Sequence, residues 1–135
     1  MSQENVEIVR RAHEAWNRDD FDAARALIHP DFELRQPPDL FLGMEGVYGG
    51  AAGLRQWWDG AKEPWAYFKS HIERTLDEGD TVVTVERFEA VGRDSGAKVE
   101  FRPVANVWRL RSRLVVSFAT YYSLEEALEA AGLSE

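Results

Sequence analysis

Two side chains of this sequence are candidates for moving a proton, Glu86 and His13. Glu86 lies in a segment whose alternation predicts a strand, with Thr84 and Phe88 on the same face. If that face is the inner one, desolvation would raise the pKa of the Glu86 carboxyl. A carboxyl tuned in this way accepts or donates a proton near neutral pH. The alternative is an ordinary carboxylate that pairs with an arginine or faces solvent.

His13 lies on the apolar side of a predicted helix, together with Val9 and Trp16. It is a candidate general base or ligand donor, although a histidine in this setting is more often a core residue with satisfied hydrogen bonds. His13, His29 and His71 share no metal-ligand spacing, and the chain has no cysteine. The sequence therefore predicts neither a metal nor a cofactor.

Composition narrows the class of protein further. The 135 residues suit a single domain, 1–135, and 44% of them are hydrophobic. A net charge of −8 argues against nucleic acid and against an anionic membrane surface. No apolar run is long enough to cross a bilayer, and the N-terminus does not have the pattern of a signal peptide. We therefore expect a soluble, cytoplasmic protein.

The elements that must position these residues follow from periodicity and turn signals. Two amphipathic helices precede a strand at 31–36, the second helix begins after Asp19 and Asp20, and Pro30 ends it. Residues 39–50 form a glycine-rich rim loop without the lysine or Ser/Thr pair of a phosphate cradle. Further elements are predicted along the rest of the chain: a helix at 51–62, strands at 67–76, 81–92, 98–110 and 114–122, and a helix at 124–131.

Two predicted hairpin turns give a register for the last three strands. A turn at 94–97 places Glu86 opposite Ala105, and a turn at Ser112 and Arg113 places Ala105 opposite Thr120. One face would then carry Thr84, Glu86, Ala105 and Thr120. Both faces are half apolar, so alternation alone does not identify the inner one.

The order of several segments resembles a known family. The opening ENVEIVRRAHEAWNRDDFDAARALIHPDFELRQP, then GLRQWW, DEGDTVVTVERFEAVGRDSG, PVANVWRL and the ending YYSLEEALEAAGL are similar to SnoaL-like proteins of the nuclear-transport-factor-2-like superfamily. The resemblance covers nearly the whole chain. It implies an α+β fold: a cone-shaped, strongly curved, mostly antiparallel sheet with three N-terminal helices on its concave face and a short C-terminal helix. It also implies a homodimer through the outer sheet face.

The resemblance identifies the inner face and hence a candidate site. In this superfamily the residue two after the proline of the PV pair, here Ala105, lines the pocket, which places Glu86 inside as the acid or base. Thr120, Gln36 and Tyr122 would donate hydrogen bonds to a developing enolate. The predicted ligand-binding residues are Trp16, Leu34, Gln36, Trp57, Thr84, Phe88, Phe101, Ala105, Phe118, Thr120 and Tyr122. Trp65 and Trp108 are assigned to the core edge or a dimer surface.

The known mechanisms of the superfamily do not carry over residue by residue. Ala12 stands where the ketosteroid isomerase has a tyrosine, Gln36 where it has its base, and Ala105 where it has a protonated aspartate. The polyketide-cyclase aspartate has no counterpart after Leu110.

Three hypotheses therefore stay open. The first is a cyclase- or isomerase-like enzyme that transfers a proton on a hydrophobic or aromatic carbonyl compound. The second is a non-catalytic small-molecule binding domain. The third is a dimerisation domain whose pocket is filled by Trp16, Trp57 and Phe101.

Overall fold

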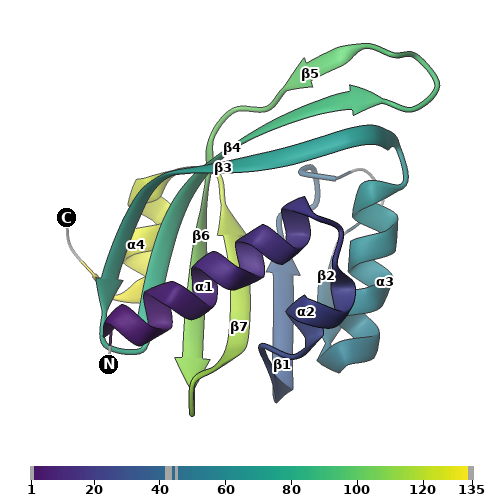
Figure 1. Ribbon diagram of the computed structural model, residues 1–135. Coiled ribbons are helices and arrows are strands. Elements are labelled where there is room, and N and C mark those ends of the chain that lie inside the picture. The colour runs from purple at the N-terminus through teal and green to yellow at the C-terminus, as the bar shows by residue number, and fades with distance from the viewer. Residues whose placement is uncertain (1, 42–43, 45, 134–135) are drawn as a thin grey trace.

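The computed structural model describes residues 2–41, 44 and 46–133. Four helices and seven strands follow one another along this part of the chain (Figure 1). The helices are α1 (Ser2–Asn17), α2 (Phe21–Arg25), α3 (Gly50–Lys62) and α4 (Leu124–Ala131). The strands are β1 (Ile28–Gln36), β2 (Gly46–Gly49), β3 (Trp65–Glu78), β4 (Thr81–Gly92), β5 (Lys98–Glu100), β6 (Val104–Arg111) and β7 (Leu114–Tyr121).

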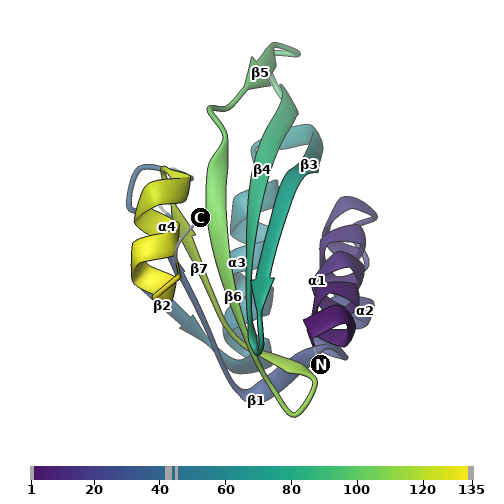
Figure 2. The same ribbon diagram turned by 90° about the vertical axis from the view of Figure 1, so that its left-hand side faces the viewer.

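The strands form one curved sheet in the order β2-β1-β7-β6-β4-β3, with β5 paired to the end of β4. All described pairs are antiparallel except β1 and β7. Figure 2 shows α1 and α4 on opposite sides of this sheet. The predicted α+β fold with a curved, mostly antiparallel sheet is confirmed.

Each face of the sheet has its own apolar layer. The larger layer packs the inner face against α1 and α3 and includes Val9, Leu34, Trp57 and Trp108. The smaller layer lies under α4, where Ala127 and Leu128 cover Val83, Ala105 and Val107 of β4 and β6. Both faces of the central strands are therefore buried, which explains why their sequences are apolar on both sides.

Local sequence signals account for several element ends. The Asp20 side chain accepts a hydrogen bond from the Ala23 N–H and begins α2, and the Ser123 side chain caps α4 through the Glu126 N–H. The predicted boundaries of α4 are those observed. Ser112 and Arg113 both have positive φ, as the tight β6–β7 turn requires.

Several predicted boundaries are wrong. The second helix ends at Arg25, and Pro30 lies inside β1, which begins at Ile28. Residues 46–49 of the predicted rim loop form β2 on the edge of β1, while residues 42, 43 and 45 lie outside the described part of the chain. The predicted strand at 98–110 divides into β5 and β6, because residues 101–103 interrupt the ladder. Pro103 has no N–H group to donate to a neighbouring strand.

The predicted register is wrong by one residue on each side of β6. Glu86 pairs with Val104 instead of Ala105, and Thr120 pairs with Asn106. The β6–β7 turn is as predicted, with Arg111 opposite Leu114, but a bulge at Val116 shifts the pairs beyond it. A shift of one residue turns a strand over, so Asn106 and Trp108 face inward and Ala105 faces outward.

Candidate functional site

A cavity of about 90 Å³ lies between the inner face of the sheet and helices α1 and α3. Five of the predicted ligand-binding residues form part of its apolar wall: Trp16, Leu34, Trp57, Phe88 and Phe118. Four predicted polar residues also line it: His13, Gln36, Glu86 and Thr120. The described wall is otherwise mostly aromatic and aliphatic.

Glu86 is the most deeply buried charged side chain of this wall, with 4% of its surface exposed. The Ser70 hydroxyl donates to its Oε1 atom at 2.8 Å. Thr84 Oγ1 and Asn106 Nδ2 both donate to its Oε2 atom, each at 2.6 Å. Three donors offset much of the cost of removing the carboxylate from water.

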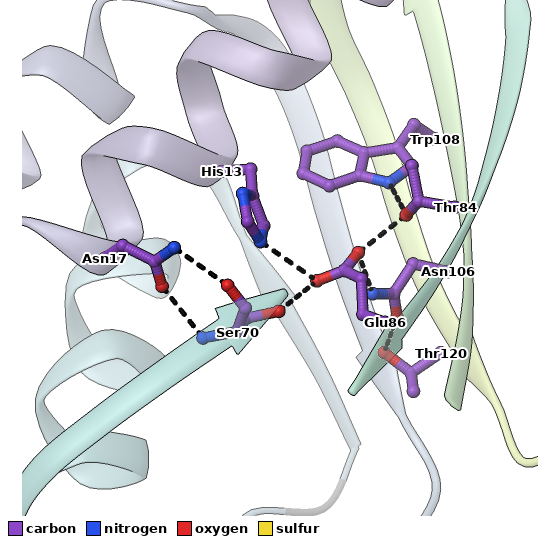
Figure 3. A network of polar contacts seen from close by, with 8 residues as sticks. All are labelled: His13, Asn17, Ser70, Thr84, Glu86, Asn106, Trp108 and Thr120. Atoms are coloured by element: carbon purple, nitrogen blue, oxygen red, sulfur yellow. Dashed lines mark hydrogen bonds and ion pairs between the residues drawn. The ribbon is translucent and has the colours of Figure 1, made fainter. Parts of the chain in front are cut away.

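Two further residues fix the direction of these hydrogen bonds (Figure 3). The indole of Trp108 can only donate, and it donates to Thr84 Oγ1 at 2.9 Å, so the Thr84 hydrogen is directed to Glu86. Thr120 Oγ1 donates to Asn106 Oδ1 at 2.7 Å, which turns the Asn106 amide hydrogens toward Glu86. A carboxylate has about four acceptor positions. Oε2 accepts two hydrogen bonds and Oε1 one, which leaves one acceptor position on Oε1.

His13 approaches this same oxygen. Its Nε2 atom lies 3.8 Å from Glu86 Oε1, is buried, and has no hydrogen-bond partner among the described residues. Burial lowers the pKa of His13, and the negative charge of Glu86 opposes that effect without cancelling it. The imidazole is therefore uncharged near neutral pH.

Helix α1 is joined to β3 beside this pair. The Asn17 side chain accepts from the Ser70 N–H and donates to the Ser70 carbonyl, both at 2.9 Å (Figure 3). Asn17 is one helical turn after His13, and Ser70 itself donates to Glu86. One asparagine thus sets the separation between the element that carries His13 and the strand that supports Glu86.

Gln36 is the other polar group with hydrogen-bonding capacity in the wall. Its Oε1 atom accepts a hydrogen bond from the Trp57 indole at 2.8 Å, so its amide hydrogens are directed away from that indole. Among the described residues, none is recorded as accepting from that amide. The Trp57 indole therefore fixes the orientation of the Gln36 amide.

Four predicted ligand-binding residues lie outside the cavity wall. Ala105 faces α4 because of the register shift. Thr84 is fully buried behind Glu86, and Tyr122 follows the end of β7 with 49% of its surface exposed. Phe101 packs against Phe88 instead, with ring centroids 5.8 Å apart.

Sequence reasoning also missed residues that shape the site. The predicted register, which placed Ala105 on the inner face, placed Asn106 and Trp108 on the outer face, and this is wrong. The assignment of Trp108 to the core edge or a dimer surface is also wrong, because Trp108 lines the cavity. Ser70 and Asn17 gave no sequence signal, since their roles depend on contacts across 53 residues. A polar Asn106 between Ala105 and Val107, in the otherwise apolar first half of β6, was the signal that could have been used.

The described residues contain no group of three or more His, Cys, Asp or Glu side chains that could hold a metal ion. Among the same residues, no helix has the length and apolar character of a membrane span.

Solved structures with this architecture are NTF2-like proteins. One, of unknown function, from Burkholderia pseudomallei is 20% identical, with a TM-score of 0.79 over 96% of this chain and 97% of that one. Another, from Burkholderia thailandensis, is 26% identical, with a TM-score of 0.75 over 92% and 96%. TerC, co-crystallised with polyporic acid, is 17% identical, with a TM-score of 0.79 over 93% and 96%.

Residues 9–118 match the SnoaL-like domain, and the chain belongs to that family. The resemblance inferred from the sequence is thereby confirmed. No curated protein matches the chain in sequence.

Proposed function

We propose that this protein binds a small, largely apolar carbonyl compound and transfers a proton on it, with Glu86 as the acid or base. One observation carries the proposal: a buried carboxylate with one unused acceptor position adjoins an apolar cavity, beside an uncharged histidine. Proton abstraction next to a carbonyl needs a positioned base and a hydrogen-bond donor for the enolate oxygen.

Each requirement has a candidate residue. Oε1 of Glu86 takes the proton from the carbon next to the carbonyl. The Gln36 amide donates to the carbonyl oxygen as it becomes an enolate, since Trp57 already occupies the Gln36 oxygen. Thr120, which we also considered for this role, directs its hydrogen to Asn106. Tyr122 is too exposed for the role.

The size of the cavity limits the substrate. A volume of about 90 Å³ is smaller than an engineered apolar cavity of roughly 150 Å³ that holds benzene, and far below the roughly 300–1,000 Å³ of pockets for drug-sized ligands. A short ketone fits the cavity as it stands. A polycyclic compound requires Trp16 or Trp57 to move, because these two indoles contact each other and form part of the wall.

The proposal is tested by proton exchange on butanone. We expect the protein to accelerate exchange of the hydrogens next to the carbonyl with D₂O, followed by NMR. Glu86→Gln keeps the shape of the side chain and removes the base, so exchange should fall to the background rate. Glu129→Gln on α4, on the other side of the sheet, is the matched control and should exchange as the unsubstituted protein does.

An equal exchange rate in Glu86→Gln and Glu129→Gln would contradict the role of Glu86. A protein that binds butanone but leaves its exchange rate at background would instead support the second candidate function, a non-catalytic binding domain. Co-crystallisation of the similar fold TerC with polyporic acid supports a small-molecule ligand under either function.

We also propose a homodimer through the outer sheet face. Tyr67 on β3 has 44% of its surface exposed, which supports an interaction surface there. Light scattering after size-exclusion chromatography tests this: Tyr67→Lys should shift the protein to monomer, and an unchanged mass would contradict the proposed surface. The cytoplasmic location stays a prediction.

A further inference from the structure

Glu86 is a buried anion without a cationic partner among the described residues. Buried carboxylates are nearly always paired with a cation or a metal. Within the described part of the chain, the only ion-pair partner of Glu86 is His13, at 3.8 Å, and no lysine or arginine there pairs with it. Its hydrogen-bond donors Ser70, Thr84 and Asn106 are all neutral.

His13 does not neutralise this charge near neutral pH. Burial lowers the pKa of His13, and nearby His71 works in the same direction. Glu86 and Glu14 raise it, yet the net shift is downward. The cavity therefore presents a negative charge and a neutral imidazole on the same wall.

His13 Nε2, which has no partner among the described residues, and Glu86 Oε1, which accepts one hydrogen bond from Ser70, are suitably spaced for a bridging donor. In the tautomer that carries its hydrogen on Nδ1, His13 Nε2 is an acceptor, as is Glu86 Oε1. A single nitrogen can lie at hydrogen-bond distance, about 2.9 Å, from both atoms of a pair that is 3.8 Å apart. Such a nitrogen needs two N–H donors, and a positive charge on it would compensate Glu86.

The remaining wall suits the carbon part of such a molecule. Trp16, Trp57, Trp108 and Phe118 line the same cavity, and aromatic rings attract both alkyl groups and cations. Trp16 and Trp57 are tilted by 31° with centroids 4.9 Å apart, and Trp108 and Phe118 meet edge to face at 4.6 Å. Charge, acceptors and aromatic surface thus converge on one small cavity.

We infer that this cavity binds small primary or secondary alkylammonium cations, with the N–H groups bridging Glu86 Oε1 and His13 Nε2 and the alkyl group against the aromatic wall. This binding goes beyond the proton transfer proposed above and does not depend on it. An ammonium ligand and a ketone substrate would compete for the same acceptor position on Oε1.

The test compares three probes of similar size on the unsubstituted protein at pH 7.5 by calorimetry and by tryptophan fluorescence. Isobutylammonium has a charge and N–H donors, tetramethylammonium has the charge alone, and isobutanol is neutral. We expect isobutylammonium to bind at least about tenfold more tightly than isobutanol, since one charge-assisted hydrogen bond in a buried site supplies that much. Tetramethylammonium should bind less tightly than isobutylammonium.

Two variants locate the binding. Glu86→Gln should remove the preference for isobutylammonium over isobutanol, and His13→Leu should weaken isobutylammonium while leaving isobutanol little changed. Glu129→Gln is the matched control and should retain the full preference.

Equal affinity for isobutylammonium and isobutanol in the unsubstituted protein would overturn the inference, and would indicate that water fills the space between His13 and Glu86. An unchanged preference in Glu86→Gln would overturn it as well. If Glu86→Gln does not fold, the comparison of the three probes on the unsubstituted protein and the affinities of His13→Leu still test the inference. The absence of alkylammonium binding would not contradict proton exchange on butanone, and the absence of exchange would not contradict alkylammonium binding. The two proposals are therefore tested separately.

Discussion

A histidine–glutamate pair lies on each face of the β3–β4 hairpin, and the two pairs differ in almost every respect. Both members of the outer pair belong to the hairpin, whereas the histidine of the inner pair comes from α1. On the outer face, His71 Nε2 lies 3.0 Å from Glu89 Oε1, and both side chains are about 40% exposed. On the inner face, His13 and Glu86 are 3.8 Å apart with 11% and 5% of their side chains exposed. The exposed pair is in hydrogen-bond contact, whereas the buried pair is not.

The comparison shows how position on a sheet assigns a role to the same two residue types. Glu89 takes its hydrogen bond from its histidine, which lowers the pKa of that carboxyl. Glu86 takes its hydrogen bonds from Ser70, Thr84 and Asn106, so its histidine remains unsatisfied and faces the cavity. The outer pair is complete in itself, whereas the inner pair leaves His13 Nε2 without a partner among the described residues.

The largest difference between the two faces should appear when the carboxylates are removed. Glu86→Ala deprives three buried donors of their acceptor, and we expect a loss of about 3–5 kcal/mol in the free energy of unfolding. Glu89→Ala removes an exposed carboxylate and should change stability little. Urea denaturation measures both. A Glu86→Ala variant as stable as the unsubstituted protein would mean that the cost of burying the charge outweighs its hydrogen bonds.

A smaller effect should follow when the inner network is weakened at its far end. Thr120→Val keeps the side-chain volume but leaves Asn106 Oδ1 without its donor, which should cost about 1–2 kcal/mol of unfolding free energy. The same substitution at the exposed Thr75 of β3 is the control. If the two variants lose equal stability, the direction of the Asn106 amide does not depend on Thr120.

The smallest expected effect is a difference between the two pairs in how the free energy of unfolding depends on acidic pH. The folded-state pKa of His13 lies below its ordinary value of 6.5, so the unfolded chain binds this proton first as pH falls. Stability attributable to His13 is therefore full above pH 6.5 and declines below it, until the folded-state pKa is passed. The lowered pKa of Glu89 acts only below its ordinary value of 4.5.

Unfolding measured between pH 7.5 and 5 should therefore separate the two pairs. His13→Gln should flatten the decline just below pH 6.5, whereas His71→Gln removes only a lesser cause of the lowered His13 pKa and should leave most of the decline in place. A decline that persists in His13→Gln would show that another group is responsible for it.

The sequence was sufficient to identify the inward-facing side chains of β4 and β7. Thr84, Glu86 and Phe88 alternate along β4, and the resemblance to the family placed them on the inner face, where they lie. Phe118 and Thr120 on β7 also lie on the predicted face. The start of α4 followed from its capping residue, Ser123. Alternation and capping are local properties, and a single sequence records them.

The sequence was not sufficient for β6, which lies between two irregularities. The turn predicted at 94–97 is displaced, because Lys98 pairs with Val91 and not with Arg93, but a displacement of two residues keeps each side chain on its face. The break at 101–103 and the bulge at Val116 each shift the register by one residue, and neither has a strong local signal. Together these two shifts return β7 to its predicted face and leave β6 alone turned over. Ala105 was therefore placed in the cavity in place of Asn106. The contact between Asn17 and Ser70 was missed because it joins elements distant in the chain.

The position of β6 between two irregular segments has a consequence for how this cavity can change. A deletion of one residue within 101–103 would rotate β6 by one pleat, removing Asn106 and Trp108 from the wall and presenting Ala105 and Val107 instead. Neighbouring β4 and β7 would keep their faces. The part of the cavity lining that β6 contributes thus depends on chain length at a single loop, so one deletion there would change two lining residues at once.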